Sequence, residues 1–257
     1  MYRLPVSGTK VFLRELTGAE DVLLAEAPES DTALALALIS RLAQPVEESE
    51  VQWDALTLTD LDALLLMIRR RVLGETISGD FSCPAETCGA RVDVAFKITD
   101  YLAYQNPRKP RGVEETDEAG WFHLRGSPVS FRLPNSADQI EIGNRAEPVR
   151  DLIRRCVRPP ESSGRLLQRV ENAMEALAPS LTTNLHGVCS ECGSAFEFRF
   201  DPQQFILREL RDQAAFVYED VHLLAQHYQW SEVEIMSLPR TRRIRYVEMI
   251  LQEKGQT

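Results

Sequence analysis

The N-terminal part of the chain alternates between short strand-like stretches and longer helix-like ones. Residues 2–17 carry apolar side chains around a glycine, which predicts one or two short strands. A run of strong helix formers between Asp31 and Leu42 predicts a helix, with Asp31 as its N-cap. Leucines at helical spacing predict a second helix between Thr59, which can cap it, and Gly74, which stops it.

Two segments that lie far apart in the sequence share the pattern of strand, cysteine turn and strand. In residues 76–104 and again in residues 181–202, two cysteines in a short turn are followed directly by a glycine. Large apolar residues then occupy every second position, and an alternation of period two places them on one face of a strand. Each segment is therefore predicted to be a β-hairpin with an apolar face to bury.

The remaining segments mix helices and strands. Between the cysteine turns, the pattern predicts a hairpin over Trp121–Leu133 and short helices over Ser136–Ile142 and Pro148–Val157. It then predicts a long helix over Pro202–Tyr228, followed by a capping box and a last helix. We therefore expect an α+β fold in five segments: residues 1–75, an N-terminal strand and helix region; 76–104, the first knuckle hairpin; 105–180, an insertion with a hairpin and helices; 181–202, the second knuckle hairpin; and 203–257, a C-terminal helical region.

The two cysteine turns together carry the ligand set of a zinc ion. Structural zinc prefers four ligands in a tetrahedron, and a short turn aims two thiolates at one point. Each turn supplies half of the set, so the simplest arrangement places Cys83, Cys88, Cys189 and Cys192 on one ion. The sequence thus predicts a zinc ribbon built from two cysteine-knuckle hairpins distant in sequence, with helical regions at both ends of the chain.

Other interpretations of the cysteines stay open. The pairs can be two separate redox pairs, although no thioredoxin-like βαβ pattern surrounds the second one, or the site can have lost its metal. His186, three residues before Cys189, can also replace a ligand or simply face solvent on the first strand. Cys156 stands alone in its segment and is interpreted as a small, buried apolar residue.

Charge and composition narrow the classes of function. The chain has 29 basic and 39 acidic side chains and a formal net charge of −10, which repels nucleic acid and anionic membranes at long range. Charges near the N-terminus leave no room for a signal-peptide core, and no apolar stretch approaches the ~20 residues of a membrane span. The sequence has no phosphate loop and no catalytic motif of the metalloprotease or hydrolase type. We therefore expect a cytoplasmic, non-catalytic protein without a small-molecule substrate.

Two stretches near the C-terminus raise the question of binding partners. The arginines of residues 240–245 suggest nucleic-acid binding, but residues 239–254 have only a modest basic excess, and such arginines are commonly solvated or paired. The predicted helix over Pro202–Tyr228 is apolar on more than one face, so it must be buried by the core or by another protein. We expect Tyr218 and Trp230 to face such a partner.

Several stretches, in this order along the chain, resemble one family. They are residues 13–18, residues 58–74, both cysteine turns, residues 131–138 and residues 230–249, which begin Trp-Ser-Glu-Val-Glu-Ile. The chain resembles the T-even-phage-type baseplate hub assembly chaperones encoded in phage tail and contractile injection system gene clusters. Family members more often carry two Cys-Pro-x-Cys-Gly turns. Here the first turn has four residues between its cysteines, and the second turn lacks the proline.

The resemblance implies a non-catalytic role in building the hub of a contractile-tail baseplate. The implied partners are hub, spike or tape-measure proteins. A permanent structural subunit of the baseplate is the first alternative, a zinc-ribbon nucleic-acid-binding regulator is the second, and a redox enzyme is the third.

Overall fold

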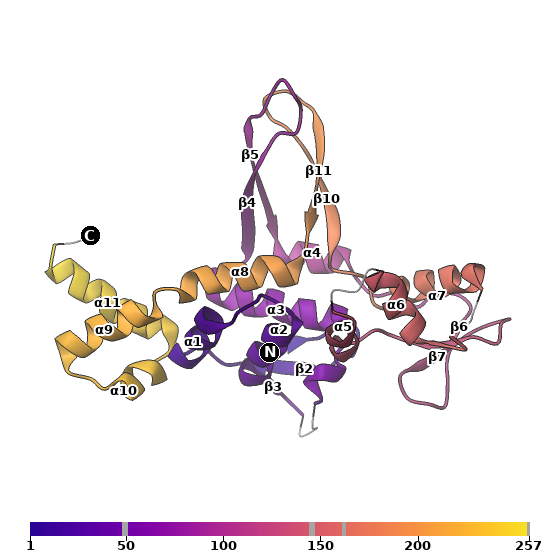
Figure 1. The fold of residues 1–257 in the computed structure, drawn as a ribbon, viewed down its shortest axis with the longest axis horizontal. Helices are drawn as coiled ribbons and strands as arrows, with labels where there is room; N and C mark the ends of the chain where they lie inside the picture. Colours follow the sequence, from indigo (N-terminus) through magenta and orange to yellow (C-terminus); the bar gives the residue numbers. More distant parts are fainter. Residues whose placement is uncertain (48–50, 144–146, 161–162, 256–257) are drawn as a thin grey trace. The chain divides into compact units, whose positions relative to one another are not determined.

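The computed structural model describes residues 1–47, 51–143, 147–160 and 163–255 (Figure 1). Helices and strands are both abundant, which confirms the expected mixture of α and β structure. The chain forms two compact units. Residues 1, 10–49 and 203–257 make up the first unit, and residues 2–9 and 50–202 make up the second. The division into five segments stays a prediction.

The first unit combines a short β-ribbon with helices from both ends of the chain. Its elements are β2 (Lys10–Leu13), α1 (Gly18–Glu26), α2 (Thr32–Leu42), β3 (Ala43–Pro45), α8 (Pro202–Ala214), α9 (Val217–Tyr228), α10 (Glu232–Ser237) and α11 (Arg240–Glu253). Strands β2 and β3 pair antiparallel, with Leu13 opposite Ala43. Helix α2 begins where the sequence predicts, because Asp31 caps it by accepting a hydrogen bond from the amide of Leu34 at 2.9 Å.

The prediction of one long helix over Pro202–Tyr228 is wrong. The structure divides it into α8 and α9, with Ala215 and Phe216 between them. Phe216 is 64% exposed, whereas Val217 is buried. Neither glycine nor proline marks the break, so tertiary packing sets it and not local propensity. Because the helix is interrupted at this break, α8 and α9 can each bury a different apolar face, as expected for a segment with apolar residues on more than one face.

Helices α1, α9 and α11 are joined by buried ion pairs. Asp21 of α1 is fully buried and pairs with two arginines of α11, Arg240 at 2.5 Å and Arg243. Arg243, whose side chain is 2% exposed, also donates from Nε to Oδ2 of Asp220 in α9 at 3.0 Å. Two of the four arginines in residues 240–245 therefore neutralise carboxylates of their own unit and are not available to solvent.

Helix α10 packs closely on α1. It begins with the expected capping box, in which the Ser231 hydroxyl accepts a hydrogen bond from the amide of Glu234 and the Glu234 carboxylate accepts one from the amide of Ser231. Where the two helices meet, a Cβ on Gly18 would lie 2.9 Å from the Cα of Met236, closer than two such carbons come. Packing therefore requires a glycine at this position.

The second unit contains a long helix, a four-stranded sheet and two hairpins. Its elements are β1 (Tyr2–Arg3), η1 (Trp53–Ala55), α3 (Leu58–Leu73), β4 (Thr76–Ser82), β5 (Arg91–Lys97), α4 (Ile98–Tyr104), β6 (Val113–Glu115), β7 (Trp121–Leu124), β8 (Ser130–Arg132), α5 (Ser136–Ile142), α6 (Pro148–Arg155), β9 (Val157–Arg158), α7 (Gly164–Leu177), β10 (Thr183–Val188) and β11 (Ala195–Phe200). Strands β6 to β9 form one antiparallel sheet in sequence order, and Phe131 and Val157 lie in its core with Val170 of α7. The predicted hairpin and short helices of this region are confirmed.

Helix α3 is capped by Thr57 and not, as predicted, by Thr59. The hydroxyl of Thr57 accepts a hydrogen bond from the amide of Asp60 at 3.2 Å. The hydroxyl of Thr59 instead donates to the carbonyl of Pro179 at 2.9 Å, 120 positions away. The helix ends at Gly74, as expected, where φ is +92° and glycine is favoured.

Candidate metal centre

Two antiparallel hairpins, β4–β5 and β10–β11, stand side by side in the second unit (Figure 1). The register of each hairpin runs without a bulge from one end to the other. Phe81 of β4 contacts Phe198 of β11, with ring centroids 4.3 Å apart. The two predicted hairpins are therefore confirmed, and their apolar faces pack against each other.

Aromatic side chains join the hairpins at their base. Phe96 of β5, Phe200 of β11 and Tyr101 of α4 contact one another, with ring centroids 5.2 to 5.4 Å apart. The hydroxyl of Tyr101 donates a hydrogen bond to the carbonyl of Leu181, just before β10. Each aromatic pair of this kind contributes roughly 0.5–1.5 kcal/mol beyond the burial of its surface. The base is thus held without any contribution from the turns.

The two cysteine turns lie at the other end of the hairpins. In each turn, the amide of the first cysteine donates to a carbonyl across the turn: Cys83 to Ala90 at 2.8 Å, and Cys189 to Ser194 at 2.9 Å. The glycine after the second cysteine has a φ of +59° in the first turn and +72° in the second. Glycine adopts these angles at little steric cost, so it allows each turn to bend back tightly.

The four thiols that the sequence singles out lie together. The sulfur atoms of Cys83, Cys88, Cys189 and Cys192 are all within 4.8 Å of one another. Cys83 lies 3.6 Å from Cys192, and Cys88 lies 3.9 Å from Cys189. A tetrahedral site with metal–sulfur bonds of about 2.3 Å has sulfur–sulfur edges of about 3.8 Å. The group can therefore hold a metal ion, and these two of its six sulfur–sulfur separations are close to the edge of such a tetrahedron.

The surroundings of the thiols differ. Cys83 and Cys189 are buried, whereas Cys192 is exposed. The hydroxyl and the amide of Ser194 donate hydrogen bonds to Cys192 and lower the pKa of its thiol to about 6. At Cys83 the amide of Ala85 lowers the pKa, but burial and the neighbouring thiols outweigh it and raise the pKa to about 12. Four thiols this close do not all ionise readily, because the thiolates repel one another. A bound divalent cation offsets that repulsion and favours the thiolate form.

His186, the alternative ligand, lies outside this group. It stands on β10 opposite Glu197 of β11, with its side chain 76% exposed and its Nδ1 3.9 Å from the Glu197 carboxylate. Within the part of the chain that the structure describes, the group able to hold a metal consists of the four cysteines alone.

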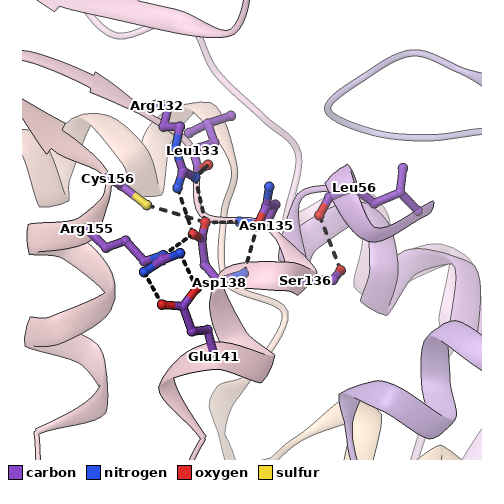
Figure 2. A network of polar contacts seen from close by, with 9 residues as sticks. All are labelled: Leu56, Arg132, Leu133, Asn135, Ser136, Asp138, Glu141, Arg155 and Cys156. Atoms are coloured by element: carbon purple, nitrogen blue, oxygen red, sulfur yellow. Dashed lines mark hydrogen bonds and ion pairs between the residues drawn. The ribbon is translucent and has the colours of Figure 1, made fainter. Parts of the chain in front are cut away.

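Cys156 is buried, as expected, but it also belongs to a polar network that the sequence did not reveal (Figure 2). Its thiol donates to Oδ2 of Asp138 at 3.7 Å. Asp138 forms a capping box with Asn135 at the start of α5 and accepts hydrogen bonds from Arg132 at 2.5 and 2.7 Å and from Arg155 at 2.7 Å. Burial alone would raise the pKa of Asp138, but these donors lower it to about 2. The network joins β8, α5 and α6.

The two residues predicted to face a partner have different surroundings. Tyr218, near the start of α9, is 49% exposed, and its hydroxyl donates to Oε1 of Glu26 at 2.6 Å. Trp230 stacks on Tyr228 at 4.8 Å and meets Tyr246 edge-on at 5.1 Å, against the core of α9, α10 and α11. Tyr218 is therefore open to a partner, whereas Trp230 is held largely within its own unit. The binding role of both residues stays a prediction.

Comparison with known protein families shows which family the chain belongs to. Residues 1–164 match the model of the family described as T4 bacteriophage base plate protein. The chain belongs to this family. The match confirms the resemblance seen in the sequence and gives the protein a role in the baseplate, in company with other baseplate proteins. No curated protein and no solved structure matches the chain. In the described residues, every helix is too short or too polar to cross a membrane.

Proposed function

We propose that this baseplate protein is a non-catalytic chaperone or scaffold for assembly of the baseplate hub of a contractile phage tail or injection system. The observation that carries the proposal is the match of residues 1–164 to a baseplate family. The proposed clients are hub, spike or tape-measure proteins in the bacterial cytoplasm. Tyr218 supports this function because half of its aromatic side chain is exposed and free to contact a client.

We further propose that the four clustered cysteines hold one structural zinc ion and so complete a zinc ribbon. The sulfur–sulfur separations of 3.6 and 3.9 Å support it, because both are close to the edge of a zinc–sulfur tetrahedron. The ion would join turns whose cysteines are up to 109 positions apart in the sequence. A closed site of four sulfurs keeps no coordination position for water or substrate, which supports a structural role and not a catalytic one.

Deletion of the protein, combined with the composition of purified particles, tests the function. We expect deletion to abolish assembled baseplates and the protein to be absent from wild-type particles, as a chaperone would be. The family description equally fits a permanent baseplate subunit, which would be required but present in particles at a fixed copy number. If deletion leaves the number and structure of the particles unchanged, both candidates are wrong.

A substitution at Tyr218 tests the partner surface. Tyr218→Asp should reduce the capture of hub, spike or tape-measure proteins in a pulldown, because it places a charge where the exposed ring would be buried. Gln226→Asp is the matched control, since it adds the same charge at an exposed position of the same helix. Unchanged capture by a folded Tyr218→Asp protein would remove this surface from the proposal. Trp230→Asp is less informative, because it would also disrupt the ring contacts of Trp230.

A further inference from the structure

A cavity of about 480 Å³ opens between the end of α1, helix α8 and the start of α9, within the first unit. Ala25 and Ala215 line it with small apolar side chains, and Tyr218 adds an aromatic ring. Arg208 and Arg211, one turn apart on α8, add two guanidinium groups. The cavity thus combines apolar surface with two guanidinium groups and one carboxylate, that of Asp212, in a chain whose net charge is −10.

The two arginines keep their charge available. Arg211 is held in place because Nη1 donates to the hydroxyl of Ser30 at 3.0 Å and Nη2 donates to the carbonyl of Ala27 at 2.7 Å. Neither partner is a carboxylate. Arg208 is exposed, and among the residues that the structure describes its guanidinium contacts the ring of Phe205, 5.7 Å from the centroid. Both charges can therefore pair with a negatively charged group that enters the cavity.

One aromatic side chain lines the cavity with these arginines, and a second one close to it in the sequence is exposed. The ring of Tyr218 lines the cavity, and Phe216, two positions earlier in the chain, is 64% exposed. The break between α8 and α9 leaves Phe216 in solvent while it turns Val217 into the core. Aromatic and arginine side chains together are enriched at the centres of protein–protein interfaces, where they contribute most of the binding energy.

We propose that this cavity binds an acidic segment of a partner protein, with a carboxylate on Arg208 and Arg211 and an apolar side chain against Ala215 and Tyr218. The inference rests on the proposed function, in which the partner is another baseplate protein. Guanidinium groups bind carboxylates through paired, charge-assisted hydrogen bonds, and the exposed guanidinium of Arg208 has N–H groups to offer.

Carboxylates around the cavity favour a peptide over a phosphate-rich ligand. Asp212 also lines the cavity, and Glu26 accepts the hydrogen bond from the hydroxyl of Tyr218 at 2.6 Å. A nucleic acid carries a charge on every phosphate and would meet these carboxylates as well as the arginines. A peptide with one or two carboxylates next to apolar residues can place each group against its complement.

Binding of defined peptides to the full-length protein tests the inference. The probes are overlapping synthetic peptides that cover the hub, spike and tape-measure proteins encoded in the same gene cluster. We expect the bound peptides to carry Asp or Glu next to apolar residues, and to bind Arg208→Glu about tenfold more weakly or worse. Arg242→Glu reverses an exposed charge on α11 and is the matched control, which should bind like the parent protein. Single-stranded RNA and inorganic phosphate, added as competitors at physiological salt, should not displace the peptides.

Three results would overturn the inference: no bound peptide, equal binding to Arg208→Glu, or displacement by RNA or phosphate that depends on Arg208. Thermal melting of each variant verifies that it is folded. Assembly experiments separate this inference from the proposed function. If deletion of the chain blocks assembly but Arg208→Glu supports it and binds the peptides normally, the cavity inference is wrong and the function stands. If deletion leaves assembly intact, the proposed function itself is wrong.

Discussion

Replacing Gly187 with alanine should loosen the second cysteine hairpin, because this position has no room for a side chain. Gly187 of β10 pairs directly with Phe196 of β11. A methyl carbon on Gly187 would lie 2.5 Å from Cζ of that ring and 2.9 Å from Cε1. Carbon atoms in favourable contact are about 3.5–4.0 Å apart, so the ring would have to move by about 1 Å. Phe196 is 8% exposed and packs in the same cluster as Cys83 and Cys189, which resists that movement.

The expected loss of stability is about 1–3 kcal/mol, the usual range for adding a methyl group to a packed site. Gly79 of β4, in the other hairpin, is the matched control. Its nearest neighbour is Cε2 of Phe81 at 3.7 Å, an ordinary contact. Alanine at position 79 should be neutral or should stabilise by up to about 1 kcal/mol, because it restricts the unfolded chain. Both substitutions restrict the unfolded chain equally, so their difference isolates the clash with Phe196.

Hydrogen exchange of the hairpin amides measures this difference locally. A loss of 2 kcal/mol corresponds to roughly thirtyfold faster exchange of amides that open with the hairpin. We expect faster exchange in β10 and β11 for Gly187→Ala, and unchanged or slower exchange in β4 and β5 for Gly79→Ala. Equal exchange in the two variants would refute the close packing of Phe196 over Gly187.

Three further predictions concern the clustered thiols and the buried charges. Protein purified without added metal should carry one zinc ion per chain by elemental analysis. Serine at any of the four clustered cysteines should abolish metal binding and loosen the cysteine turns, whereas Cys156→Ser should keep the metal; a folded, metal-free preparation of the parent protein would contradict the site. Asp138→Asn should lower the free energy of unfolding by about 2–3 kcal/mol, and the exposed Glu141→Gln by less than about 0.5 kcal/mol. The pKa of Asp138 is lowered to about 2, so its contribution to the free energy of unfolding should be complete above about pH 4 and disappear as the pH falls towards 2. Parallel pH–stability profiles of Asp138→Asn and the parent protein would argue against the network. Asp21→Asn should lower the free energy of unfolding by about 3–5 kcal/mol, because it leaves the charges of two buried arginines partly uncompensated. A melting temperature no lower than that of the control Glu248→Gln would contradict this prediction.

Short-range signals were sufficient to predict the cysteine hairpins. An alternation of period two and a glycine after each pair of cysteines are patterns that span only a few residues. The preference of zinc for four ligands then connects the two pairs, even though Cys88 and Cys189 are 101 positions apart. The cluster of four sulfurs is what that reasoning predicts, and the structure contains it.

Long-range contacts account for what the sequence did not reveal. Thr57 and Thr59 are the same residue type, so the sequence does not distinguish them as N-caps. In the structure the hydroxyl of Thr59 donates a hydrogen bond to the distant carbonyl of Pro179 and does not cap the helix. Arg243 belongs to a stretch that resembles a basic surface patch, yet it is buried because it pairs with Asp21, 222 positions away. No sequence period or motif predicts contacts between residues so far apart in the chain. The break between α8 and α9 has the same origin, since no glycine or proline marks it.

The pair of hairpins shows why a metal site is useful at this place in the fold. A two-stranded ribbon is marginally stable at best in water, because it buries little apolar surface. Here two ribbons pack against each other, and the rings of Phe96, Tyr101 and Phe200 hold them at the base. At the cysteine turns, the buried cluster consists of two cysteines, a valine and a phenylalanine. A metal ion bound there would stabilise the end of the ribbons where packing is weakest, so its removal should loosen the turns before the aromatic base.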